Sequence, residues 1–251
     1  MKRYYSQRWL QLLVLGLLLM TSGLWAGESP VSVQVVRDSL ETTFSRVQDY
    51  TAEIVVSVKL PKFRMPRKRV DVYYKYPDKI RIQAEGFAIV PKGGIMLSPI
   101  QIFKNTQDLS VLQDSTNGQT VLLSGILNPD SSGLFTGRLD PEDKTPVQIQ
   151  IWVDTGKWIV QKVHTFRDTT IDVTIQTEYT HYKDLYWLPN STDVTMMLGK
   201  SFMGRVHADG PRNIEGEDLP KPDTDIKGSV RLEFSHYKVN KGLDDRIFEK
   251  K

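Results

Sequence analysis

The sequence predicts an α+β domain in which one N-terminal amphipathic helix lies on a curved antiparallel sheet. Apolar residues recur every three to four positions between residues 36 and 47, and from residue 51 onward they recur at every second position. The stretch Val147–Pro189 alternates most regularly and contains a turn at residues 154–157, so it reads as an antiparallel meander. About ten strands with one or two helices favour a single domain over two.

One helix of roughly 15 residues is expected after Pro30. Val36, Leu40, Phe44 and Val47 recur at spacings of four, four and three, so their side chains form one apolar stripe. A helix with a single apolar face needs a partner surface, because its own propensity does not make it stable in water. The sheet is the surface that this sequence provides.

The strands are expected over short alternating segments that prolines, glycines and turn residues separate. They are residues 51–60, 70–76, 80–84, 87–90, 109–113, 120–123, 147–153, 158–163, 171–179, 192–198 and 230–234. A short helix is expected from Ser98–Pro99 through Phe103. Residues 127–146 and 199–228 are rich in glycine, proline and aspartate, and we expect long irregular connections there.

The first 26 residues have the order of a secretory signal peptide. Basic residues precede an apolar run, Trp9–Met20, and small residues follow it up to Ala26. The run is shorter than the roughly 20 residues that a membrane span needs. We therefore expect cleavage near Ala26 and a periplasmic mature domain, residues 27–251, without a lipid anchor. An uncleaved anchor is the alternative.

Composition excludes several kinds of chemistry. The chain has no cysteine, which excludes disulfides, thiolate metal sites, cysteine nucleophiles and the acylated cysteine of a bacterial lipoprotein. The chain has 33 basic and 30 acidic residues, and removal of the three basic residues of the signal peptide leaves a neutral mature domain. A neutral exported domain gives no electrostatic reason to expect a nucleic-acid partner.

No residue pattern for catalysis, a cofactor or a metal stands out. The four histidines, His164, His181, His207 and His236, lack a metal-ligand spacing. A glycine-rich phosphate loop and a nucleophile-elbow motif are also missing from the sequence. Residues distant in sequence can assemble a site in space, so these patterns disfavour an enzyme without excluding one.

A basic cluster, defined as the cationic residues from Lys62 to Arg69, lies between two expected strands. Its ordinary interpretation is a solvated hairpin. The functional alternative is contact with anionic lipid headgroups or an acidic partner, because a basic side chain near such a membrane contributes roughly 1 kcal/mol. Phe63 and Met65 within the cluster add some weight to this alternative.

The apolar face of the expected sheet is larger than one helix can cover. Either the sheet curls on itself and fills its interior with side chains, or it leaves a cavity for an apolar ligand, and both outcomes stay open here. The alternation defines which residues would face such a cavity. They are Ile54, Val56, Val72, Tyr74, Tyr76, Ile80, Ile82, Ile149, Ile151, Val173 and Ile175.

Several short motifs follow one another in a characteristic order. They are Asp49–Glu53 at the first strand, Tyr76–Ile82, Ile151–Asp154, Tyr179 followed by Leu188–Pro189, and the closing Asp244–Phe248. Behind a signal peptide and one amphipathic helix, this order resembles the outer-membrane lipoprotein-sorting proteins, the LolA-like family, and their RseB-like relatives. The likeness covers most of the mature chain.

The resemblance implies an unclosed antiparallel half-barrel, lidded by helices, whose concave face accepts acyl chains. It implies a monomeric, non-enzymatic carrier that takes lipid or lipoprotein acyl chains from a membrane-bound donor and passes them toward the outer membrane. Such carriers usually place an arginine before the proline of the first turn motif, where this chain has Tyr76. A lipid-sensing module that regulates an inner-membrane partner and a structural β domain with a filled interior are the alternatives.

Overall fold

The computed structural model describes residues 31–60, 63–64, 66–84, 98–114, 119–128, 145–168, 170–198 and 226–249. The expected signal peptide, the strand at 87–90 and most of the two long connections lie outside these residues. Within them, no helix is long and apolar enough to cross a membrane.

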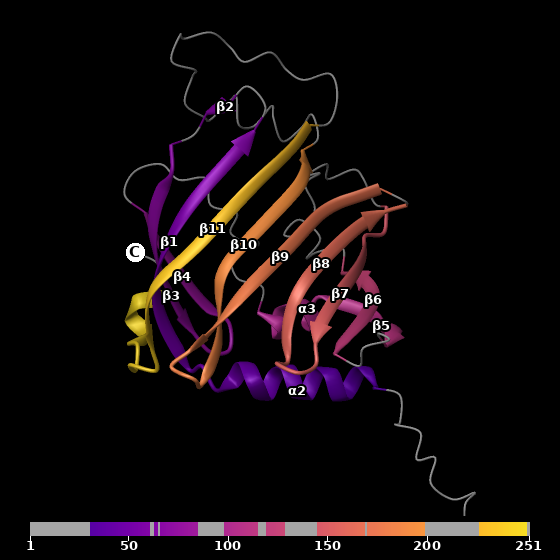
Figure 1. Cartoon of the computed structure of the whole chain (residues 1–251), viewed down its shortest axis with the longest axis horizontal. Coiled ribbons are helices and arrows are strands. Elements are labelled where there is room, and N and C mark those ends of the chain that lie inside the picture. The colour runs from indigo at the N-terminus through magenta and orange to yellow at the C-terminus, as the bar shows by residue number, and fades with distance from the viewer. Residues whose placement is uncertain are drawn as a thin grey trace, which may run out of the picture. The chain divides into compact units, whose positions relative to one another are not determined.

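The described residues form one curved sheet with three short helical elements (Figure 1). The helical elements are α2 (Val33–Ser45), α3 (Pro99–Lys104) and the 3-10 helix η2 (Asp245–Phe248). The strands are β1 (Asp49–Leu60), β2 (Phe63–Arg64), β3 (Lys68–Lys75), β4 (Lys79–Ala84), β5 (Thr106–Asp114), β6 (Thr120–Leu127), β7 (Gln148–Asp154), β8 (Ile159–Arg167), β9 (Thr170–Tyr182), β10 (Tyr186–Leu198) and β11 (Ile226–Val239).

The sheet is antiparallel and is not closed into a barrel. Its strand order is β4-β3-β1-β11-β10-β9-β8-β7-β6-β5, and β2 pairs with β1 off this path. In the described part of the chain, β4 and β5 are therefore edges that do not pair with each other. The predicted α+β class with an unclosed antiparallel half-barrel and one N-terminal helix is confirmed.

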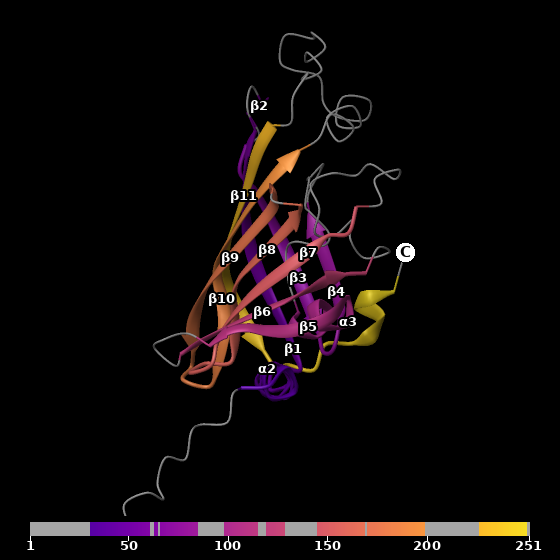
Figure 2. The ribbon, with the colours of Figure 1, turned by 90° about the vertical axis from the view of Figure 1, so that its right-hand side faces the viewer.

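Helix α2 crosses beneath one end of the strands, as the two views in Figures 1 and 2 agree. It begins where the Ser32 hydroxyl accepts a hydrogen bond from the backbone N–H of Val35 at 3.3 Å, an ordinary N-terminal cap. Val36 and Leu40 on its predicted apolar stripe are fully buried. The helix ends at Ser45, so its 13 residues are close to the expected length.

A row of aliphatic side chains crosses the sheet from β1 to β5 without a break. Residues paired across neighbouring strands point to the same face, so the members of the row pack side by side. The row consists of Val58, Val230, Val194, Ile175, Val163, Ile151, Leu123 and Val111. We call the face that carries this row the inner face. Its middle is a packed core, where each fully buried side chain contributes roughly 1.5–3 kcal/mol.

Strand β10 begins at Tyr186, well before the expected start at Thr192. Proline has no N–H for a ladder hydrogen bond, which is why the sequence around Pro189 looked like a connection. A register shift between Pro189 and Ser191 accommodates the proline inside the strand. The longer β10 pairs with β9 down to Tyr182, and this hairpin extends to the end of the sheet that α2 crosses.

The segment after β11 is fastened to the start of β1. Asp49 is only 4% exposed, and its carboxylate accepts backbone N–H groups of Lys241 at 2.8 Å, Gly242 at 2.8 Å and Leu243 at 3.3 Å. The side-chain oxygen of Asn240 accepts the N–H of Asp49 at 3.3 Å. These contacts hold the segment that follows the last strand, β11, against the start of the first strand, β1.

The same C-terminal segment covers the β4 edge of the sheet. Lys75 donates to the carbonyl oxygen of Leu243 at 2.8 Å and forms an ion pair with Asp245 at 2.7 Å. Arg81 on β4 donates to the carbonyl oxygen of Ile247 at 2.6 Å. Because η2 occupies this side, β4 does not present a bare edge to another strand.

Candidate functional site

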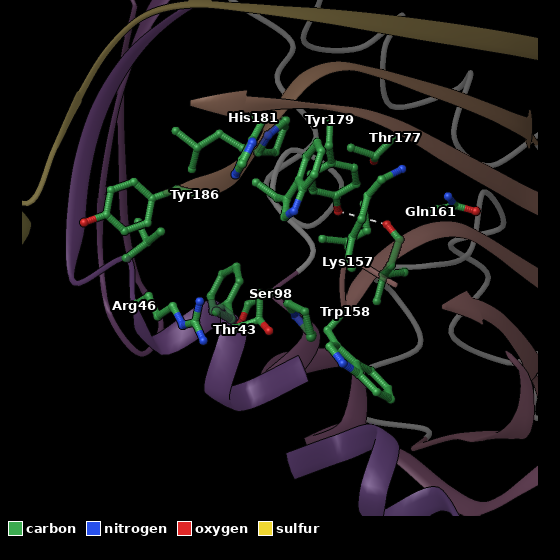
Figure 3. A pocket seen from close by; sticks show the side chains of 18 of the residues that line it. Thr43, Arg46, Ser98, Lys157, Trp158, Gln161, Thr177, Tyr179, His181 and Tyr186 are labelled. Atoms are coloured by element: carbon green, nitrogen blue, oxygen red, sulfur yellow. Dashed lines mark hydrogen bonds between the residues drawn. The ribbon is translucent and has the colours of Figure 1, made fainter. Parts of the chain in front are cut away.

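A cavity of about 330 Å³ lies where α2 crosses the strand ends (Figure 3). Its walls come from the last turn of α2, the start of α3, the hairpins β7–β8 and β9–β10, and single positions on β1, β3 and β4. This volume is at the low end of the roughly 300–1,000 Å³ that is usual for small-molecule sites. The cavity is therefore large enough for one small ligand or part of a longer one.

Aromatic rings form one end of the cavity. Tyr50 and Tyr74 line it, and their ring centroids are 5.1 Å apart, while Phe44 from α2 meets Tyr74 edge-on at 5.6 Å. Burial raises the pKa of both tyrosines above the ordinary value, so their hydroxyls stay neutral. The Tyr74 hydroxyl donates to the carbonyl oxygen of Pro77 at 3.2 Å.

Strand β9 supplies alternate residues of the sheet wall. Tyr179 donates its hydroxyl hydrogen to the carbonyl oxygen of Val160 at 2.9 Å, the dashed line in Figure 3, and burial raises its pKa. Thr177, two residues earlier on the same face, shares a 3.1 Å hydrogen bond with the hydroxyl of Thr192. Neutral hydroxyls and rings make this wall mildly polar without adding charge.

The two hairpins give the cavity a polar rim. The ring of His181 stacks on Trp187 with centroids 4.5 Å apart, and Lys157 lies 5.2 Å over the same indole. Lys157 also forms a 3.2 Å ion pair with Asp154. Asp184 in the β9–β10 turn faces His181 at 3.6 Å. The cavity therefore combines an apolar interior with polar side chains along these two hairpins.

The helical wall carries three polar side chains, Thr43, Arg46 and Ser98, which Figure 3 labels. Ser98 precedes α3 and is 3% exposed, yet its hydroxyl has no hydrogen-bond partner among the described residues. Arg46 directly follows the last residue of α2, is exposed and also lines the cavity. These residues were not predicted, because their meeting depends on how α2 packs against α3.

The predicted cavity residues divide into two groups. Tyr74, Ile80 and Ile175 line the cavity. The others lie elsewhere on the sheet: Ile54, Val56, Val72, Ile149, Ile151 and Val173 are buried in the packed core, and Tyr76 and Ile82 are half-buried. That these residues contact a ligand stays a prediction.

Sequence reasoning missed the hairpin contribution to the site. Trp158 and Trp187 lie at strand ends beside turns, where a large aromatic residue has no packing role in a simple two-faced strand. Leu185 lies in the β9–β10 turn and is 61% exposed, and it also lines the cavity. The large apolar residues at the two turns were the signal in the sequence that could have predicted this part of the cavity lining.

Among the described residues, no group of three or more His, Asp or Glu side chains could hold a metal ion. His164 lies outside the cavity and meets the ring of Trp152 at 4.7 Å. The buried pair Arg167–Asp172, 3.1 Å apart, is also not part of the cavity lining. The cavity therefore suits binding through shape, apolar contact and single polar groups.

Comparison with solved structures identifies the fold. The crystal structure of a LolA superfamily protein from Nitrosomonas europaea matches with a TM-score of 0.51 and 12% sequence identity, over 88% of this chain and 98% of that chain. The chain has the LolA-superfamily fold. The resemblance found in the motif order is thereby confirmed at the level of the fold.

Two further crystal structures are similar to this chain. An outer membrane lipoprotein-sorting protein domain from Vibrio parahaemolyticus has a TM-score of 0.47 and 13% identity, over 84% of this chain and 95% of that chain. A DUF1329 family protein from Desulfovibrio piger has a TM-score of 0.48 and 11% identity, over 86% and 97%. The sequence matches no family model and no curated protein.

Proposed function

We propose that this protein is a periplasmic, non-enzymatic carrier. In this proposal it holds an apolar chain of a lipid or lipoprotein in the cavity between α2 and the strand ends, and it moves that chain toward the outer membrane. The observation that carries the proposal is the cavity, with its aromatic interior and polar rim, in a LolA-superfamily fold. An apolar interior with few convergent polar groups is the usual design of a site for an amphipathic small molecule.

Non-covalent burial is sufficient for such a role. Each methylene group moved out of water contributes about 0.8 kcal/mol, so a chain segment of about six methylenes contributes roughly 5 kcal/mol. Binding of this size corresponds to a dissociation constant of roughly 0.2 mM before other contacts are added. A carrier needs this intermediate strength, because the ligand must leave again at its destination.

Uptake of a fatty-acyl probe by delipidated protein tests the proposal. Native mass spectrometry of the purified protein, before and after addition of a fluorescent fatty acid, should show one bound chain. Protein that takes up no probe after delipidation, while its circular dichroism spectrum is unchanged, would refute the carrier function.

A matched pair of variants places the probe in the cavity. Thr177→Trp puts a large ring into the cavity and should abolish uptake, because Thr177 lines it from β9. Thr177→Val removes the same hydrogen bond to Thr192 but keeps the volume, so it should bind normally. Equal binding by both variants would show that the probe sits elsewhere.

The small volume of the cavity also favours a second function, lipid sensing for an inner-membrane partner. A sensor binds one signal molecule and changes its contact with a protein, whereas a carrier exchanges its ligand between membranes. Transfer of a labelled lipid from donor to acceptor vesicles separates the two functions. Transfer that the protein accelerates supports the carrier, and binding without acceleration supports the sensor.

A further inference from the structure

We propose that the ligand of the cavity is a single-chain amphiphile with an anionic oxygen headgroup, a carboxylate or a phosphate, held on the helical wall by Arg46 and Ser98. The inference rests on the proposed function, because it assumes that the cavity accepts a lipid chain. It adds the chemical class of the headgroup and its binding residues.

The Ser98 hydroxyl is a buried polar group whose partner is missing from the described chain. Buried hydroxyls nearly always form a hydrogen bond, since leaving one unpaired is destabilising. Ser98 stands at the N-terminal cap position of α3, yet its side chain makes no capping hydrogen bond. Its side chain lines the cavity instead, where a ligand oxygen could accept the hydroxyl hydrogen.

Arg46 supplies a charge on the same wall. It follows the last residue of α2, three positions after Thr43, so both side chains reach the same side of the helix. Its carbonyl oxygen accepts the side-chain N–H of Asn240 at 3.0 Å, which holds its backbone in place. The guanidinium outweighs the partial negative charge at the end of the helix, and its planar fork matches a carboxylate or phosphate.

The two lysines that line the cavity already have partners. Lys157 is paired with Asp154 at 3.2 Å, and Lys162 lies 4.8 Å over an indole ring. Asp184, the acidic lining residue among those described, has a side chain that is 97% exposed. Arg46 is thus the lining cation with neither a carboxylate nor an aromatic partner in the described part of the chain. An anionic headgroup would bind there.

The size of the cavity limits the apolar part to one chain. A volume of about 330 Å³ is near the lower limit for a small-molecule site, and the aliphatic row closes the middle of the inner face with packed side chains. A headgroup at Arg46 and Ser98 with one chain along the aromatic end fits this space better than an anchor of several chains.

Titration with three probes that differ only in the headgroup tests the inference. The probes are tridecanoate, dodecyl phosphate and dodecanol at neutral pH, which share the same alkyl chain, and the readout is tryptophan fluorescence, since Trp158 and Trp187 line the cavity. The two anions should bind about tenfold more tightly than the alcohol. Arg46→Ala should remove that difference, and Arg46→Lys should restore part of it.

Two controls separate a binding role from a structural one. Lys104→Ala removes an exposed positive charge from α3 outside the cavity, and it should leave all three affinities unchanged. Ser98→Ala should weaken the binding of the anions severalfold while keeping or raising the thermal stability, because it removes an unpaired buried hydroxyl. Binding to Arg46 should also weaken with salt, since this residue is exposed.

The outcomes distinguish this inference from the proposed function. If dodecanol binds as tightly as the anions and Arg46→Ala changes nothing, the headgroup inference is overturned while lipid binding stands. If none of the probes binds to delipidated wild-type protein, the proposed function fails and the inference fails with it. A preference for one anion over the other identifies the headgroup as carboxylate or phosphate.

Discussion

Replacing Asp49 with alanine should lower the free energy of unfolding by about 4 kcal/mol. The carboxylate is 4% exposed and accepts three backbone N–H groups at 2.8, 2.8 and 3.3 Å. A hydrogen bond to a charged group contributes about 1.5–3 kcal/mol, and the bonds are not additive. Water can reach Lys241 and Gly242, which are exposed, so the loss should stay below the sum of three such bonds.

Urea denaturation of the whole domain, followed by circular dichroism, measures this loss. Asp49→Asn keeps one carbonyl oxygen in place and should lose about half as much stability. Asp38→Ala is the matched control, because Asp38 is an exposed aspartate with one side-chain hydrogen bond, from Gln34 at 2.8 Å. It should change stability by less than about 0.5 kcal/mol. A loss below about 1 kcal/mol for Asp49→Ala would show that the C-terminal segment is not a stabilising clamp.

Three further predictions follow from burial and charge. Gly125→Ala should lower the free energy of unfolding by about 2 kcal/mol, because a Cβ there would lie 2.7 Å from the carbonyl oxygen of Gln107. Urea denaturation measures this loss, and unchanged stability would contradict the close approach. Burial raises the pKa of Tyr50 and Tyr74, so the stability that these two neutral hydroxyls contribute should be constant below the ordinary tyrosine pKa of about 10 and should fall as pH rises above it. Absorbance that shows every tyrosine of the folded protein titrating at about pH 10 would contradict this. Arg67→Ala in the basic cluster should weaken binding to phosphatidylglycerol vesicles roughly fivefold and should not affect binding to phosphatidylcholine vesicles. Equal binding of the wild-type protein to both kinds of vesicle would support the solvated hairpin instead.

The sequence predicts the parts of this fold that depend on periodicity. The stripe from Val36 to Val47 is a local pattern, and so is the alternation through Ile149 and Ile151, which is why α2 and β7 lie close to their expected positions. The start of β10 was missed because Pro189 looks like a strand breaker until its partner strand and its bulge are known.

The site was less predictable because it depends on contacts between distant segments. Alternation identifies which residues face inward. It does not distinguish the residues that other side chains cover from those that remain open to the cavity. Ile175 sits in the aliphatic row and still reaches the cavity, whereas Ile151, its neighbour but one in that row, is fully buried. Arg46 and Ser98 line the same cavity although they belong to the ends of two helices, α2 and α3, and no sequence period encodes the contact between these helices.

The two edges of the sheet explain how a half-barrel stays open. On the β4 side, Arg81 holds the chain end near η2 across the edge. On the β5 side, two register shifts and the left-handed conformation of Asp108, with φ of 52°, interrupt the regular ladder. Neither described edge offers a long regular row of backbone groups to another strand, so the sheet can remain unclosed without pairing between copies.

This design has a consequence for any cargo larger than the cavity. The strands from β4 to β5 are joined by one continuous ladder, and the aliphatic row packs across it, so widening the sheet would break many contacts at once. Among the described residues, helix α2 packs against the rest of the fold chiefly through the buried side chains of Val36 and Leu40. For the proposed carrier, admitting a second chain would require α2 to move away from the strand ends while the sheet keeps its curvature.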